Sequence, residues 1–177
     1  ADLGGGSIEI IALRRGEVCH SVSLNYGHLS SVTASEIGSA LAEHSWIRDF
    51  GAKQLFGVGG SFRTIGSAFI SRTGYPLHVL HGLKIKRKDV LAICRDLRSD
   101  EPSLEGVPPS RVATIPVAAM IIQKLIDFSS VYRLTVSGTS VRDGVIAINE
   151  LNAYQQADFL MAVSEEIADS SGRVANV

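Results

Sequence analysis

An aspartate, three glycines and a serine stand at residues 2–7, and a glutamate follows at residue 9. Glycines have no Cβ, so a run of them lets several backbone N–H groups converge on an anion, for which phosphate is the natural ligand. Asp2 and Glu9 add two carboxylates, the hard oxygen ligands that hold Mg²⁺ beside a phosphate. This stretch therefore predicts phosphoryl chemistry, and the alternative is that Asp2 only caps a turn and Glu9 is an exposed residue of a hairpin.

Two further turns of small residues follow expected strands, GVGGS at 57–61 and SGTS at 137–140. A turn that precedes a helix also offers the positive end of the helix dipole to an anion. Ser7 invites interpretation as a nucleophile, but no histidine or aspartate has the local spacing of an activating base. The three turns together favour the binding of a phosphorylated ligand without covalent catalysis.

Hydrophobic periodicity predicts the elements that hold the first two turns. Residues 7–27 contain two alternating apolar runs, joined by a charged turn that contains Gly16, and this pattern is typical of a β-hairpin. Thr33 lies three residues before a glutamate, as in a capping box, and starts a helix predicted to end at Gly51. A strand, the second glycine turn and a helix from about residue 61 to 71 follow.

The second half of the chain predicts more helix than strand. A short helix is expected over Asp89–Leu97, followed by a proline-containing loop. Residues 112–128 are strongly apolar and predict a buried helix, which Pro116 is expected to split because proline removes a backbone donor. The run RLTVS at 133–137 predicts one more strand, and helical periodicity returns after the third turn.

Composition restricts the class of protein. The 177 residues are 45% hydrophobic and carry a formal net charge of −1, which fits an ordinary globular chain and predicts neither nucleic acid nor a membrane as partner. Cys19 and Cys94 have no metal-like or disulfide spacing, so a cytoplasmic location is expected. The basic run at 84–88 predicts a solvated face, with a polyphosphate track as the alternative.

Four spaced motifs resemble one family. DLGGGSIEI at 2–10 is similar to the second phosphate loop of the actin-like ATPase superfamily, and specifically to the D-[IL]-G-G-G-S-x-E signature of the exopolyphosphatase and guanosine pentaphosphate phosphohydrolase family. GVGGSFRTIG at 57–66, VLHGLKI at 79–85 and LTVSGTSVRDGVI at 134–146 resemble later segments of that family. Asp143 stands where the family often has glutamate.

The resemblance implies an α/β fold, an actin-like (ribonuclease H-like) lobe with a mixed sheet flanked by helices. It implies Mg²⁺-dependent release of terminal phosphate from inorganic polyphosphate or from guanosine pentaphosphate (pppGpp). By position, Asp2 and Glu9 become the metal ligands and the catalytic carboxylates. The implied phosphate-binding residues are Gly4, Gly5, Gly6, Ser7, Gly57, Gly59, Gly60, Ser61 and Arg142. For Arg142, pairing with Asp143 is an equal alternative.

In the family, a homologous lobe with a water-positioning glutamate precedes this point. We therefore expect residues 1–150 to be the second lobe, and residues 151–177 to be a helix and tail that begin a further helical region. The missing N-terminal lobe is the expected partner, and a homodimer of the full-length protein is compatible with the resemblance. A non-catalytic module that senses nucleotide or polyphosphate is the alternative function.

Overall fold

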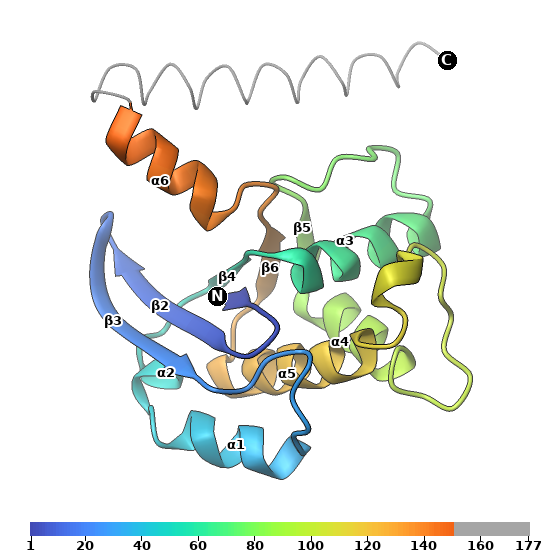
Figure 1. Cartoon of the computed structure of the whole chain (residues 1–177), viewed down its shortest axis with the longest axis horizontal. Helices are drawn as coiled ribbons and strands as arrows, with labels where there is room; N and C mark the ends of the chain where they lie inside the picture. The colour runs from blue at the N-terminus through green and yellow to red at the C-terminus, as the bar shows by residue number, and fades with distance from the viewer. Residues whose placement is uncertain (151–177) are drawn as a thin grey trace.

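The computed structural model describes residues 1–150, which form two three-stranded sheets and the helices that pack against them (Figure 1). The strands are β1 (Asp2–Leu3), β2 (Ile8–Arg14), β3 (Glu17–Leu24), β4 (Gln54–Gly57), β5 (Lys84–Lys86) and β6 (Arg133–Val136). The helices are α1 (Ala34–Ala42), α2 (Trp46–Asp49), α3 (Gly60–Thr73), α4 (Arg87–Asp96), α5 (Ile115–Ser129) and α6 (Val141–Glu150). A 3₁₀ turn covers Pro109–Arg111. The tail predicted at 151–177 lies outside the described residues.

The first sheet contains the predicted hairpin. Strands β1, β2 and β3 pair antiparallel in that order, and β2 and β3 are joined by a two-residue turn. Arg15 and Gly16 in this turn have φ values of 54° and 86°. Two positive φ values match the right-handed twist of the flanking strands, so this turn closes the hairpin without splaying it.

The second sheet has the order β4-β6-β5, with β4 parallel and β5 antiparallel to β6. A single parallel bridge between Asp2 and Val58 connects it to the first sheet. Beside the bridge, the amino group of Ala1 donates to the Phe56 carbonyl at 2.7 Å, and the Val58 N–H donates to the Ala1 carbonyl at 2.8 Å. The short strand β1 therefore lies between β2 and β4 and joins the two sheets.

The helix predicted from Thr33 to Gly51 is two helices. Its capping box is confirmed, because the Glu36 N–H donates to the Thr33 side chain and the Thr33 N–H donates to the Glu36 carboxylate at 2.7 Å. However, α1 ends at Ala42 and α2 begins at Trp46. Leu41 and Ile47 are six positions apart, roughly 240° around a straight helix, so only a break lets both enter the core.

Pro116 does not split the helix that contains it, so that prediction is wrong. Helix α5 is continuous from Ile115 to Ser129, and Pro116 is its second residue. The first four N–H groups of a helix have no partner within it, so a proline in the first turn removes no helical hydrogen bond.

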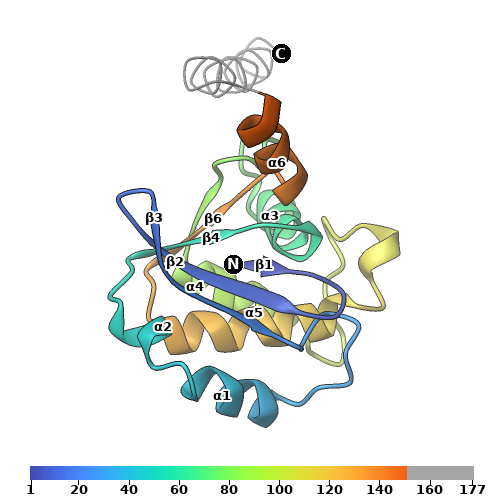
Figure 2. The same ribbon diagram turned by 60° about the vertical axis from the view of Figure 1, so that its left-hand side comes forward.

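Helix α5 forms the centre of the core. It contacts α1, α2, α3 and α4, and Figure 2 shows it running beneath the sheets with α1 at the bottom of the view. Its buried residues are Ile115, Ala118, Ala119, Met120, Ile121, Ile122, Leu125, Ile126 and Ser129. Among residues 1–150, no helix has both the length and the apolar character needed to cross a membrane.

We expect the Gly57→Ala variant to be less stable than the parent. Gly57 is buried at the end of β4, and an added Cβ there would overlap the ring of Phe62, which is itself fully buried. Overpacking of this kind costs about 1–3 kcal/mol. Chemical denaturation would measure the free energy of unfolding, with Gly38→Ala as the matched control.

Gly38 lies in α1, where an added Cβ meets nothing within 4 Å. Its replacement by alanine should stabilise the protein by up to about 1 kcal/mol, because alanine is the better helix former. Equal stabilities for the two variants would contradict the packing role of Gly57.

Candidate functional site

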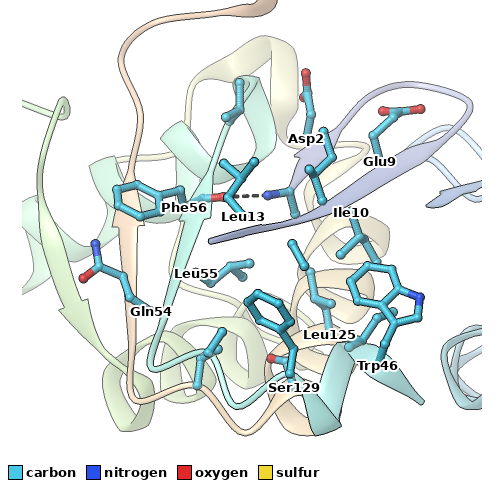
Figure 3. Close-up of a pocket in the computed structure, with 18 residues that line it drawn as sticks. Asp2, Glu9, Ile10, Leu13, Trp46, Gln54, Leu55, Phe56, Leu125 and Ser129 are labelled. Atoms are coloured by element: carbon cyan, nitrogen blue, oxygen red, sulfur yellow. Dashed lines mark hydrogen bonds between the residues drawn. The ribbon is translucent and has the colours of Figure 1, made fainter. Parts of the chain in front are cut away.

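The two predicted metal ligands are cross-strand neighbours. Asp2 of β1 and Glu9 of β2 are directly opposite each other in the antiparallel ladder. Residues so paired have Cβ atoms about 4.5–5.5 Å apart and side chains on one face of the sheet. In Figure 3 both carboxylates project from the same side of the strands. Two carboxylates that are seven positions apart in the sequence are thus adjacent in the structure.

Hydroxyl groups hold the Glu9 carboxylate in place. Ser7 Oγ donates to Glu9 Oε1 at 2.5 Å, and Ser23 Oγ donates to the same oxygen at 3.0 Å. The Ser7 hydroxyl, which was expected to donate to phosphate, therefore orients a carboxylate in this structure, and the contact of Ser7 with phosphate stays a prediction. Ser23 was not predicted as a site residue, although it pairs with Glu9 in the hairpin register.

The first and second glycine turns meet at Asp2. A Cβ added at Gly59 would lie 2.6 Å from Asp2 Oδ1, and Gly59 has a φ of 90°, which side-chain-bearing residues rarely adopt. Glycine at this position thus permits both the turn into α3 and the close approach of the carboxylate.

The first turn presents backbone donors for which residues 1–150 supply no acceptor. The carbonyls of Gly4 and Gly5 accept the N–H groups of residues 28 and 29, at 3.0 and 2.9 Å. Within residues 1–150, the N–H groups of residues 5–7 have no acceptor. Three successive free N–H groups in a tight turn form an anion-binding concavity.

The second turn also ends in N–H groups that have no acceptor within the described part of the chain, because Gly60 and Ser61 are the first residues of α3. The Ser61 side chain is buried, and its hydroxyl lies 3.5 Å from the Leu3 carbonyl and 3.5 Å from His28 Nδ1. This hydroxyl therefore connects the two turns, and an anion would meet the backbone of the turn. Gly57, as noted above, lies beneath Phe62.

An arginine that sequence reasoning missed lies against the second turn. Arg111, from the 3₁₀ turn, lies so close to Gly60 that an added Cβ on the glycine would overlap Nη2 of the guanidinium. Its Nη1 is 3.3 Å from His28 Nε2. Arg111 and Arg63 line a hollow of about 260 Å³ next to the turn. No local motif marks Arg111, which is 51 positions from Gly60 and stands in an expected loop.

In the third turn, the N–H groups of Gly138 and Ser140 already donate to side chains of the protein. The Gly138 N–H donates to His81 Nδ1 at 3.1 Å, and the Ser140 N–H donates to the Asp143 carboxylate at 2.6 Å. Within the described residues Arg142 is exposed and forms no ion pair with Asp143. The positive charge of Arg142 nevertheless helps to lower the pKa of Asp143, after the hydrogen bonds from Ser140, and its contact with phosphate stays a prediction.

The basic run lies on β5 and the start of α4. Lys84, Lys86 and Lys88 are exposed, and Arg87 pairs with Asp127 at 2.8 Å. This arrangement agrees with the predicted solvated face.

A larger cavity of about 550 Å³ has both carboxylates, Asp2 and Glu9, among its lining residues (Figure 3). Its walls are mostly apolar and come from β2, β4, α2 and α5, with Ile10, Trp46 and Leu125 among them. An apolar wall offers no donors to a polyanion. The face that suits phosphate is therefore the one formed by the glycine turns and Arg111.

The donor chemistry of the Asp2 and Glu9 pair fits Mg²⁺, which is bound through one or two carboxylates and completed by water and phosphate oxygens. In the part of the chain that the structure describes, no group of three or more His, Cys, Asp or Glu side chains could hold a metal by itself. Within residues 1–150, Asp2 and Glu9 could therefore supply only part of the ligand set of a metal.

Comparison with known proteins gives the family of the chain. A family model, the Ppx/GppA phosphatase family, matches residues 1–153. The chain belongs to the Ppx/GppA phosphatase family. No curated protein matches the sequence significantly.

Solved structures give the fold. A Ppx/GppA family member from Aquifex aeolicus is 20% identical, with a TM-score of 0.65, over 86% of this chain and 56% of that one. An exopolyphosphatase from Cytophaga hutchinsonii is 21% identical, with a TM-score of 0.68, over 82% of this chain and 54% of that one. This Ppx/GppA chain thus has the actin-like ATPase fold and spans a little over half the length of these relatives.

We expect the Asp143 carboxyl to titrate below its usual pKa of 3.8, because the hydroxyl and then the N–H of Ser140 donate to the charged form. Its contribution to folding is therefore fully present above about pH 3.8 and is lost as the pH falls through the folded-state pKa. NMR titration of the carboxyl carbon would measure this. The Ser140→Ala variant should move the pKa of Asp143 upward, and an unchanged titration would contradict the hydrogen bond from the Ser140 hydroxyl to the Asp143 carboxylate.

Proposed function

We propose that residues 1–150 form one wall of a phosphoanhydride hydrolase site, which releases terminal phosphate from inorganic polyphosphate or pppGpp with the help of Mg²⁺. The observation that carries the proposal is the convergence at Asp2 of two glycine turns with unused N–H groups. Since one solved relative is an exopolyphosphatase, inorganic polyphosphate is the first substrate to test.

Phosphoryl transfer needs positioning and charge stabilisation more than covalent chemistry by the protein. In the transition state, negative charge is spread over the phosphate oxygens, and preorganised donors lower its energy. In this proposal the N–H groups of residues 5–7 hold one phosphate and the first turn of α3 holds the next. Arg111 and Arg63 would then meet the phosphates that follow, in the hollow beside Gly60.

Asp2 and Glu9 are the proposed ligands of the metal. Bound Mg²⁺ would neutralise charge on the phosphate oxygens as they pass through the transition state. Ser7 and Ser23 keep Glu9 oriented through their hydrogen bonds, so the carboxylate need not reorganise when it binds.

The water-positioning base is proposed to come from a facing lobe. The resemblance to the phosphohydrolases implies a glutamate on that lobe, and this chain covers 56% of the Aquifex relative. One wall supplies phosphate donors and half of a metal shell, but it neither excludes water nor orients the attacking water.

The metal role of Asp2 and Glu9 can be tested by calorimetry with tripolyphosphate. Mg²⁺ should tighten binding to the parent chain about tenfold over the same titration in EDTA, since it links carboxylates to phosphate. Asp2→Asn and Glu9→Gln should each lose this gain while keeping the parental circular dichroism, because Mg²⁺ ligation needs anionic oxygens.

Asp49→Asn is the matched control, because Asp49 is an exposed carboxylate of α2 that is paired with Arg48 and belongs to none of the three turns. It should retain the full effect of Mg²⁺. Retention of that effect by both Asp2→Asn and Glu9→Gln would overturn the metal assignment.

The division of labour between lobes has a separate test. We expect this chain alone to release no phosphate from polyphosphate or pppGpp with Mg²⁺, under conditions where a full-length family member turns over. Binding without release by the full-length protein would instead favour the sensing function. Turnover by the chain alone at the full-length rate would place the base within these 177 residues.

A further inference from the structure

Arg111 has an unusual environment for a cation beside a ligand-binding turn. Within residues 1–150 it forms no ion pair with a carboxylate, and the one side-chain hydrogen-bond partner of its guanidinium there is His28. Both side chains are half-buried. A long, flexible arginine without a carboxylate partner needs another group to hold it in one orientation.

The chemistry of arginine decides which atoms of His28 carry protons. A guanidinium only donates hydrogen bonds, so Nε2 of His28 must be the acceptor of the 3.3 Å contact. In the neutral ring the proton is then on Nδ1, which faces Ser61 Oγ at 3.5 Å. The Ser61 hydroxyl in turn donates to the Leu3 carbonyl at 3.5 Å. The contacts form one directed chain from Arg111 to the end of β1.

The backbone of His28 is fixed to the first glycine turn. Its N–H donates to the Gly4 carbonyl at 3.0 Å, and the next N–H donates to Gly5. Gly27 packs so closely that an added Cβ would overlap the Gly5 carbonyl. His28 therefore touches the first turn through its backbone and the second turn through its ring.

We propose that His28 is a positioning residue that holds the Arg111 guanidinium across Gly60, so that the arginine is placed relative to both glycine turns. The proposal rests on the proposed function in one respect, which is that Arg111 meets phosphate. Its geometric content, that Nε2 of His28 accepts from Arg111, stands apart from any ligand.

The first test is tripolyphosphate affinity, measured by calorimetry. His28→Ala should weaken binding about tenfold, because Arg111 loses the acceptor that orders it. His28→Gln should stay within about threefold of the parent, since its carbonyl oxygen can replace Nε2 as acceptor. His28→Asn is the matched variant: its amide replaces Nδ1 beside Ser61 and leaves Arg111 without a partner, so it should lose as much as alanine does.

Coupling between the two residues is the second part of the test. In an Arg111→Ala background, His28→Ala should change the affinity by less than about twofold, since the group that it positions is gone. Gly60→Ala should resemble Arg111→Ala, because the new Cβ displaces the guanidinium. Equal losses for His28→Gln and His28→Asn, or additive losses in the double variant, would overturn the positioning role.

A readout without ligand separates this proposal from the proposed function. Long-range ¹H–¹⁵N spectra should show the His28 ring protonated at Nδ1 and bare at Nε2, and Arg111→Ala should remove this preference. A proton on Nε2 in the parent chain would overturn the inference. If the parent binds no tripolyphosphate while the ring has the expected tautomer, the proposed function fails and the positioning of Arg111 by His28 stands.

Discussion

The structure depends on the placement of a two-residue strand. Strand β1 pairs with β2 on one side and meets β4 at the Asp2–Val58 bridge on the other, so it is the only backbone link between the sheets among the described residues. Strand β1 leads into the first glycine turn and β4 leads into the second, so the link between these two strands sets the distance between the two turns. The backbone pairing of Asp2 with Val58 also brings the Asp2 carboxylate next to Gly59.

The placement of β1 brings the backbone of several glycines very close to polar groups of the candidate site. Gly27, Gly59 and Gly60 each lie where a Cβ would strike another part of the site: the Gly5 carbonyl, the Asp2 carboxylate and the Arg111 guanidinium. At these positions the missing side chain leaves room for a neighbour. The loops that meet here are held by hydrogen bonds and close contacts, while α5 supplies the apolar core away from the site.

Local patterns predicted most elements correctly, and the errors have physical causes. The hairpin, the capping box at Thr33 and the strand-turn-helix at β4 and α3 are all encoded by neighbouring residues. The helix before Gly51 was predicted as one piece because periodicity alone does not say that Leu41 and Ile47 must face the same core. Pro116 was expected to split its helix because the start of α5 could not be located to within a turn.

For the candidate site, the sequence by itself determined which groups are available: two carboxylates of the kind that hold a hard cation, and turns of small residues of the kind that bind an anion. The ladder of β1 and β2 places Asp2 opposite Glu9. Only the tertiary structure decided which turns meet and which basic side chain, Arg111, lies against them. Arg111 and His28 are 83 positions apart, and their contact depends on how the loop after β3 and the 3₁₀ turn pack around α3. Local spacing cannot carry that information, because the energy that brings distant segments together comes from burial of the shared core.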